Sequence, residues 1–184
     1  MSIKHGILAI LTQGPAYGLQ LRNEIDARVL RETATNVGQI YSTLERLLAS
    51  GSVRQSSHTD DGLPLYELSD RGNALAHEWL HSPAINRGDP WESMVFQVML
   101  VRSLPQTDSS RLISGMRDHW VKAHIAAQES YAPDLAHDLR SNAMETLSRA
   151  ALNWLDAVEK TSDHGFAVSS VRPPRGRRPK NVAF

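Results

Sequence analysis

The sequence contains no cysteine, which excludes disulfide bonds, thiolate zinc sites and cysteine nucleophiles and agrees with a reducing compartment. It has no apolar run long enough to span a bilayer, and its first eleven residues lack the features of a signal peptide. Phosphate-binding Walker loops, dinucleotide-binding glycine motifs and the nucleophile elbow are missing as well. These absences predict a soluble, cytoplasmic protein that is not an enzyme and needs no cofactor.

Neither sign of charge is in excess, because 20 basic and 20 acidic residues cancel over the 184 residues. Their distribution is uneven. Residues 1–81 hold 7 Lys and Arg against 9 Asp and Glu, residues 82–171 hold 8 against 11, and residues 172–184 hold 5 against none. A general polycation is therefore excluded, and any contact with nucleic acid depends on locally placed positive charge.

Apolar residues recur at helical spacing in three short segments near the N-terminus. The first two cover residues 3–11 and 17–29, and the third begins after a cap at Thr35 or Asn36 and ends at Gly51. The third segment carries the apolar residues that we expect to be buried, which are Ile40, Leu44, Leu47 and Leu48.

Two short β-prone runs follow, at residues 53–57 and 65–68, and a turn-like segment at residues 58–62 separates them. Ser69 is expected to cap a further helix over residues 70–81. Three helices and a two-stranded hairpin, in this order, are typical of a winged helix-turn-helix. In that fold the third helix enters the major groove of DNA and the wing contacts flanking phosphates.

The second half of the chain is expected to be helical. Its first helix, residues 91–104, is apolar almost all round and has to be covered on every side. Two amphipathic helices follow, and three helices are few for a monomeric core, so burial against a second copy is expected. The fold class is mainly α, and the predicted parts are a winged helix-turn-helix domain (1–81), a linker (82–89), a helical dimerisation domain (90–162) and a flexible basic tail (163–184).

Three segments together resemble the PadR family of bacterial winged-helix transcriptional regulators. They are GPAYGLQL at residues 14–21, GQIYSTLERLLASGSV at residues 38–53 and YELSDRG at residues 66–72, followed by Leu75 and Trp79-Leu80. The resemblance is close over about residues 3–81 and otherwise extends only to length and helix count. It implies a homodimer that binds an inverted-repeat operator in double-stranded DNA, usually as a repressor, and is held together by the C-terminal helices.

The candidate DNA-binding residues lie mostly on the polar side of the third helix. Amide side chains there can bond adenine, and hydroxyl groups can bond bases or phosphates. The resemblance implies that Gly38, Gln39 and Tyr41 lie at the DNA surface, with Tyr41 on a phosphate. With two residues of the wing, the full set is Asn36, Gly38, Gln39, Tyr41, Ser42, Thr43, Arg46, Arg54 and His58.

Two departures from the family pattern affect contact with the DNA backbone. Ser42 stands where the family usually has proline, which restores an N–H group and adds a hydroxyl near the DNA. The tip of the wing, which is usually basic, carries Asp60 and Asp61. Two carboxylates repel a phosphate, so we expect weak anchoring of the backbone at the wing tip.

Residues 77–81 (HEWLH) match the HExxH motif of zinc hydrolases, in which two histidines bind zinc and the glutamate acts as a general base. The longer metzincin motif fails, because Ala84 and Arg87 stand in place of its glycine and its third histidine. Trp79 and Leu80 fit core positions of the helix after the wing. A zinc hydrolase is therefore a remote alternative, and no metal site is expected.

A nearer alternative is a winged helix that serves as a protein-interaction module, because the net charge of the first 81 residues is −2. The basic tail bears on the same choice. Its segment Arg175-Gly176-Arg177, followed by Arg178, faintly resembles an AT-hook, whose Arg-Gly-Arg core lies in an A·T minor groove. The tail is a candidate DNA contact, and the alternative is a solvated basic tail that touches nothing specific.

Large aromatic and methionine side chains lie at or beyond the junction of the two regions. Such side chains suit a flat, aromatic effector, and they equally suit ordinary core and dimer contacts. The candidate effector pocket consists of Trp79, Trp91, Met94, Trp120 and Trp154.

Overall fold

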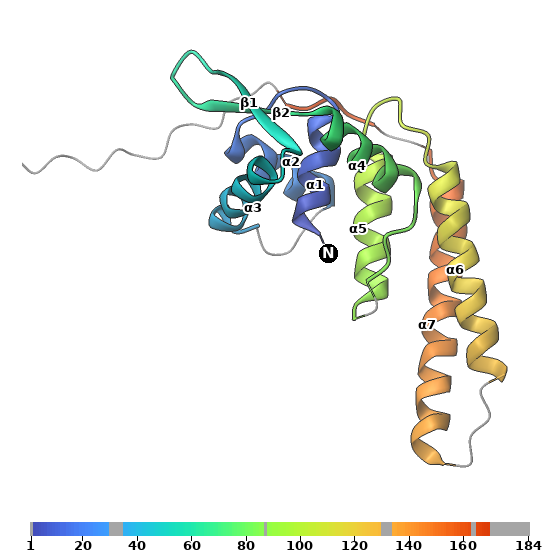
Figure 1. Ribbon diagram of the computed structural model, residues 1–184. Helices are drawn as coiled ribbons and strands as arrows, with labels where there is room; N and C mark the ends of the chain where they lie inside the picture. The colour runs from blue at the N-terminus through green and yellow to red at the C-terminus, as the bar shows by residue number, and fades with distance from the viewer. Residues whose placement is uncertain (1, 30–34, 87, 130–133, 163–164, 170–184) are drawn as a thin grey trace, which may run out of the picture.

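The chain folds into a winged helix followed by three longer helices (Figure 1). The computed structural model describes residues 2–29, 35–86, 88–129, 134–162 and 165–169. The elements in chain order are α1 (Ile3–Leu11), α2 (Gly18–Val29), α3 (Val37–Ala49), β1 (Val53–His58), β2 (Pro64–Leu68), α4 (Asp70–His81), α5 (Pro90–Arg102), α6 (Ser110–Glu129) and α7 (Leu135–Lys160). The predicted fold class is confirmed. None of the described helices combines the length and apolar character that a membrane crossing needs.

Helix α3 begins at Asn36, whose side-chain oxygen accepts a hydrogen bond of 2.8 Å from the N–H of Gly38. Its buried side is rotated relative to the prediction, because Thr43 is buried whereas Leu48 is exposed. The stripe Ile40, Leu44 and Leu47 faces α1 and α2, and at 100° per residue Thr43 falls closer to the centre of this stripe than Leu48 does. The expectation that Leu48 is buried was therefore wrong.

The wing is a single antiparallel hairpin in which Val53 pairs with Leu68 and Arg54 pairs with Glu67. The connection between α1 and α2 joins its edge, since Ala16 and Tyr66 exchange two backbone hydrogen bonds of 3.0 and 2.9 Å. The hairpin is thus fixed to the first two helices at one end, while its tip extends away from them (Figure 1).

Helix α5 lies between the winged helix and the last two helices (Figure 1). Most of its side chains are buried, whereas Trp91, Val95 and Met99 share a side that is only partly covered, so the expected cover is found on most sides of the helix but not on all. Much of the cover comes from its own chain. The apolar core runs without interruption from α1–α4 through α5 into α6 and α7. Buried Gln97 of α5 also holds the connection from α4, because it donates to the carbonyl oxygens of Trp79 and Ser82 and accepts from the N–H of Ala84.

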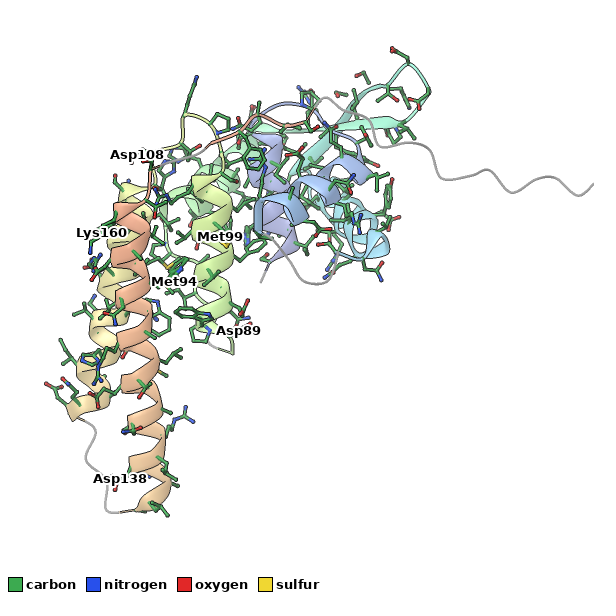
Figure 2. The ribbon with its side chains drawn as sticks, turned by 180° about the vertical axis from the view of Figure 1, so that it is seen from behind. Asp89, Met94, Met99, Asp108, Asp138 and Lys160 are labelled. Carbon is green, nitrogen blue, oxygen red and sulfur yellow. The ribbon has the colours of Figure 1, made fainter. Side chains whose placement is uncertain are left out.

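Helices α6 and α7 form an antiparallel hairpin that extends away from the winged helix (Figure 1). Asp108, just before α6, and Lys160, the last residue of α7, lie at one end, and Asp138 lies at the other (Figure 2). The hairpin packs on α5 near the first end. Towards the second end apolar side chains are left exposed, most of all Leu135 and Leu139, whose exposed fractions are 72% and 62%.

The segment after α7 differs from the predicted flexible tail. Residues 165–169, which we call the strap, return to the winged helix and lie along α2. The backbone N–H of Phe166 also donates to the carbonyl oxygen of Ser103, which follows α5 (3.0 Å). The expectation of a free tail from residue 163 is therefore wrong for the strap. The tail arginines Arg175, Arg177 and Arg178 lie outside the described residues.

Candidate nucleic-acid interface

The exposed side of α3 carries most of the predicted DNA-binding residues. Asn36, Gly38, Gln39, Ser42 and Arg46 are exposed there. Tyr41 lies on the same helix with an exposed fraction of 40%, and its ring rests against Gly18 of α2.

Thr43 is the exception. Its side chain is buried, and its hydroxyl donates to the carbonyl oxygen of Gln39 (2.7 Å) and accepts from the Arg46 guanidinium (3.1 Å). The expectation that Thr43 is exposed was wrong. Its hydroxyl instead helps to hold Arg46 along the helix.

Helix α2 fixes the point at which α3 begins. The carboxylate of Asp26 accepts hydrogen bonds from both the backbone N–H (3.0 Å) and the hydroxyl (2.6 Å) of Thr35. Arg22 pairs with Asp26 at 3.2 Å and donates to the carbonyl oxygen of Thr35 (3.0 Å). The two charged side chains of α2 thus anchor the residue before the Asn36 cap, so the polar side of α3 has a defined direction.

A groove of about 360 Å³ lies between the start of α1 and the polar side of α3. It is lined by Ser2 and Lys4 on one side and by Gln39 and Arg46 on the other, so two cations flank it. Sequence reasoning missed Lys4, because 42 positions separate it from Arg46 and no local pattern links them. The fold brings both positive charges to the same edge of α3.

The wing offers less positive charge than its sequence suggests. Arg54, which was predicted to contact DNA, pairs across the strands with Glu67 at 2.6 Å, although its own side chain is 70% exposed. His58 is exposed and its Nε2 lies 3.0 Å from the amide nitrogen of Gln55. At the tip, the Thr59 hydroxyl donates to the Asp61 carboxylate (2.6 Å), which helps to shape the turn. The side chains of the wing therefore carry no excess of positive charge.

Residues 7–78, which contain α3 and the wing, match the sequence model of the transcriptional regulator PadR-like family. They form a PadR-family domain. No curated protein matches the chain. Among solved structures, the chain is similar to Bacillus subtilis PadR in complex with operator DNA (23% identity, TM-score 0.38, covering 84% of this chain and 94% of that one). It is also similar to Bacillus subtilis PadR in complex with p-coumaric acid (21% identity, TM-score 0.39, covering 85% and 95%).

The HExxH segment lies on α4, and its two apolar residues belong to the core. The rings of His77 and His81 stack with their centroids 4.3 Å apart, while Trp79 and Leu80 between them are buried. Within the described part of the chain, no three His, Asp or Glu side chains are grouped so that they could hold a metal ion. The segment serves as the helix that closes the core, as its apolar residues indicated.

The five candidate effector residues are not brought into one pocket. Trp79 of α4 packs between His5 of α1 and Phe96 of α5. The Trp120 indole N–H donates to the Met94 sulfur (2.9 Å), and the rings of Trp91 and Trp154 contact each other with centroids 5.9 Å apart. These two pairs, Trp120 with Met94 and Trp91 with Trp154, join α5 to the α6–α7 hairpin. Met94 points to that interface (Figure 2). They are mainly packing residues.

One of these tryptophans lines a larger groove. The groove has a volume of about 660 Å³ and lies between the α6–α7 hairpin and the connection from α4 to α5. Ala126 and Met144 contribute apolar surface, Trp120 lies beneath it with an exposed fraction of 1%, and His119, His137 and Arg140 contribute polar groups. Burial, together with the charge of Lys122, lowers the pKa of His119, which keeps its imidazole neutral at neutral pH.

Proposed function

We propose that this PadR-like regulator is a transcriptional repressor that binds an inverted-repeat operator as a homodimer. The observation that carries the proposal is the polar side of α3, where Asn36, Gln39 and Ser42 are exposed together over a buried apolar stripe. These side chains offer donors and acceptors that can bond base edges in the major groove. Two such helices, one from each copy, would lie about one DNA turn apart or a multiple of it.

Contacts with the phosphate backbone are assigned to the side of α3 that faces α1. Lys4 and Arg46 flank the groove there, and Tyr41, with an exposed fraction of 40%, lies on α3 as well. We expect the wing to contribute little to phosphate binding, because Arg54 is paired with Glu67 and the tip of the wing carries two carboxylates. Binding should accordingly show a modest dependence on salt, since few phosphates are neutralised.

The second copy is assigned to the far end of the α6–α7 hairpin. Leu135 and Leu139 of α7 are exposed there, as are Val121 and Ile125 of α6, at 39% and 46%. Large apolar side chains grouped on a projecting element are a common mark of an interface. A two-fold axis at this end would place the winged helices of the two copies at the outer ends of the dimer.

An aromatic effector is assigned to the 660 Å³ groove, whose lining includes only Trp120 of the five candidate tryptophan and methionine positions. Ala126 and Met144 offer apolar surface, Trp120 lies beneath it with an exposed fraction of 1%, and Arg140 offers a cation at the same groove. A planar ring that carries an acidic group fits this combination. Binding would change the contact between the hairpin and the α4–α5 connection, and thereby the spacing of the two recognition helices.

The deciding experiment is selection of operator DNA from random duplexes with the full-length protein, followed by gel shifts with the selected sequence. Gln39→Ala should weaken binding to the selected duplex about tenfold, because one bidentate base contact is lost. Gln128→Ala, an exposed glutamine on α6, is the matched control and should bind as the wild type does. If selection enriches no sequence, the domain is better explained as a protein-interaction module.

The effector assignment is tested by titrating aromatic acids against the tryptophan fluorescence of the protein. A ligand of the groove should quench the signal of Trp120, and the quenching should disappear in Trp120→Phe. Arg140→Gln should weaken binding of the acid more than binding of its uncharged amide. Equal weakening for both would place the acidic group elsewhere.

A further inference from the structure

Glu45 lies in the middle of the exposed side of α3, although sequence reasoning did not place it among the DNA-binding residues. At about 100° per residue, four exposed positions of α3 fall within about 60° of one another and opposite the buried stripe, namely Gly38, Ser42, Glu45 and Ala49. The other three carry small side chains or none, so Glu45 projects furthest from this strip. If this side of α3 enters the major groove, the Glu45 carboxylate is the first group to reach the base edges.

The Glu45 carboxylate has no partner within the protein. It makes no hydrogen bond and no ion pair with any other residue that the structure describes. The adjacent cation, Arg46, is turned away, because its guanidinium donates to the carbonyl oxygen of Ser42 (3.1 Å) and to the Thr43 hydroxyl (3.1 Å). The acceptor capacity of Glu45 is therefore unused in the free protein.

The groups near Glu45 on the side of the wing do not neutralise it either. Burial, together with the nearby Tyr41 and Glu45, raises the pKa of Tyr66 in β2, which places these three side chains in one neighbourhood. Both neighbours are phenols and neither is a cation. Glu45 thus puts a negative charge in the middle of a surface that has to approach phosphates.

A carboxylate at a DNA interface is unfavourable unless a donor meets it, because it loses water and is repelled by the phosphates. The bases differ in what they offer it. In the major groove cytosine presents an amino donor at N4, whereas guanine presents two acceptors and thymine an acceptor and a methyl group. Adenine presents a donor at N6 beside the acceptor N7. A carboxylate therefore favours cytosine and rejects guanine and thymine.

We propose that Glu45 is a specificity-determining residue of α3, whose carboxylate accepts a hydrogen bond from the N4 amino group of one cytosine in each half-site. The proposal rests on the proposed function, because Glu45 can read a base only when the polar side of α3 lies in the major groove. Its role is distinct from that of Gln39, whose amide suits adenine.

This role also gives a use to the scarcity of positive charge in the winged helix. The first 81 residues carry a net charge of −2, so they attract DNA of unrelated sequence only weakly. A carboxylate that repels most sequences and accepts one donor widens the ratio of specific to non-specific binding, which is the quantity that selects an operator within a genome.

The first test compares the full-length wild type with Glu45→Ala, in selection from random duplexes and in gel shifts. The wild type should select a cytosine at one position of each half-site, and the variant should lose the preference at that position alone. The variant should bind the selected duplex about tenfold more weakly, and at low salt it should bind an unrelated duplex several-fold more tightly. A merely structural role would shift both affinities in the same direction.

Glu45→Gln should move the preference at this position from cytosine to adenine, because an amide offers a donor to N7 and an acceptor to N6. Glu78→Ala is the matched control. It removes the same charge from an exposed position of α4, on the other side of α1 from α3 (Figure 1), and should bind both duplexes as the wild type does. Thermal unfolding of each variant checks that the fold is kept.

The hydrogen bond itself is tested by deleting the N4 amino group of the selected cytosine, with pyrimidin-2-one in its place. The weaker base pair affects both proteins alike. Only the wild type should show a further loss of about tenfold, and Glu45→Ala should show none, because it has already lost the contact. Equal losses for the two proteins would overturn the assignment of Glu45 to this cytosine.

The outcomes separate this inference from the proposed function. If Glu45→Ala keeps every base preference while Gln39→Ala still weakens binding, Glu45 does not read a base and the winged-helix repressor stands. If Glu45→Ala tightens binding to all duplexes by the same factor, the carboxylate only repels phosphates, and the inference is again wrong. If the wild type selects no DNA, both the proposed function and the role of Glu45 fail.

Discussion

Gly18 lies directly against the ring of Tyr41, so that a β-carbon added at Gly18 would stand only 2.7 Å from Tyr41 Cε1 and 2.8 Å from its Cζ. Real side chains do not approach so closely, and the tyrosine ring would have to move. The absence of a side chain at residue 18 therefore sets where the Tyr41 hydroxyl lies on α3. A glycine of α2 in this way controls the position of a candidate phosphate contact.

Gly18→Ala should weaken operator binding while leaving the stability of the fold nearly unchanged. The Tyr41 ring is partly exposed and can swing away from the new methyl group, and alanine is the better helix former. We expect about a tenfold loss of affinity, which corresponds to one hydrogen bond to a charged group. Gel shifts and thermal unfolding measure the two effects.

Tyr41→Phe provides the comparison, because it removes the hydroxyl and leaves the ring in place. If the hydroxyl contacts a phosphate, Gly18→Ala and Tyr41→Phe should have similar effects, and the double variant should lose little more than either alone. Full additivity of the two would show that Gly18 acts on something other than Tyr41.

Asp60→Lys should tighten operator binding and steepen its salt dependence. Asp60 is exposed at the wing tip, where a carboxylate repels the approaching backbone, and the lysine would add one phosphate contact. The slope of log K against log salt should steepen by about 0.9 if only the new lysine contact contributes. It should steepen by about 1.8 if loss of the Asp60 repulsion contributes as much again. Asp61 is less suitable for this test because it accepts a hydrogen bond from Thr59 that shapes the turn.

Asp118→Lys, an exposed position on α6, controls for the change in net charge. It should leave the slope as in the wild type. Equal slopes for all three proteins would show that the wing tip never comes near the DNA.

The helices and the wing could be predicted because their signals are local. Asn36 and Ser69 cap helices by bonding the N–H groups two and three residues ahead, and Gly51 has the positive φ of 66° that ends α3. The polar side of α3 followed from the same periodicity, which is accurate to about one helical position. Thr43 and Leu48 sit at the two margins of the buried stripe, where that error matters.

The strap could not be predicted because its contacts lie far apart in the sequence. Phe166 and Arg28 are separated by 138 positions, and the composition of the segment after residue 163, which is rich in Gly, Ser and Pro, does not predict that its first part packs on α2. For the same reason the spacing of aromatic residues could not show that Trp91 meets Trp154 while Trp120 lines a groove. Long-range packing, unlike capping, leaves no pattern within one element.

Replacing Leu135 and Leu139 by Asp should convert the proposed homodimer into a monomer. Both side chains are more than half exposed near the far end of the α6–α7 hairpin, so the folded monomer loses little when they become charged. Analytical ultracentrifugation should give half the mass of the wild type, and operator binding should weaken strongly because two linked half-sites become one. Asn142→Asp, an exposed change on the same helix, should remain dimeric.

Gly72→Ala should destabilise the winged helix severely. A β-carbon at Gly72 would overlap the carbonyl oxygen of Ser52, which already accepts a hydrogen bond from the Ser69 N–H (3.2 Å), and backbone at this junction of wing and α4 cannot move freely. We expect a loss of about 3 kcal/mol or more in the free energy of unfolding. Gly88→Ala meets only an ordinary contact with Asn86, so chemical denaturation should find its stability within about 0.5 kcal/mol of the wild type.

The stability of the protein should fall as the pH drops below about 6.5, and His5 should account for part of the fall. Burial of the imidazole against Trp79, together with the charge of Lys4, lowers the pKa of His5, and its Nδ1 is buried without a hydrogen-bond partner among the described residues. Between the ordinary pKa and the lowered one, the unfolded chain binds a proton that the folded protein does not. Stability is therefore full above the ordinary pKa and decreases as the pH falls towards the lowered one.

Chemical denaturation of the wild type and His5→Phe between pH 7.5 and pH 5 measures this contribution. Phenylalanine keeps the ring against Trp79 and removes the proton, so the curve of the variant should be flatter. The difference in slope cannot exceed about 1.4 kcal/mol per pH unit for one proton, and the partial exposure of His5 reduces it. The pKa of His119 is lowered as well, so His119→Gln in the His5→Phe background should flatten the curve further. Parallel curves for the wild type and His5→Phe would mean that His5 titrates alike in the folded and unfolded chains.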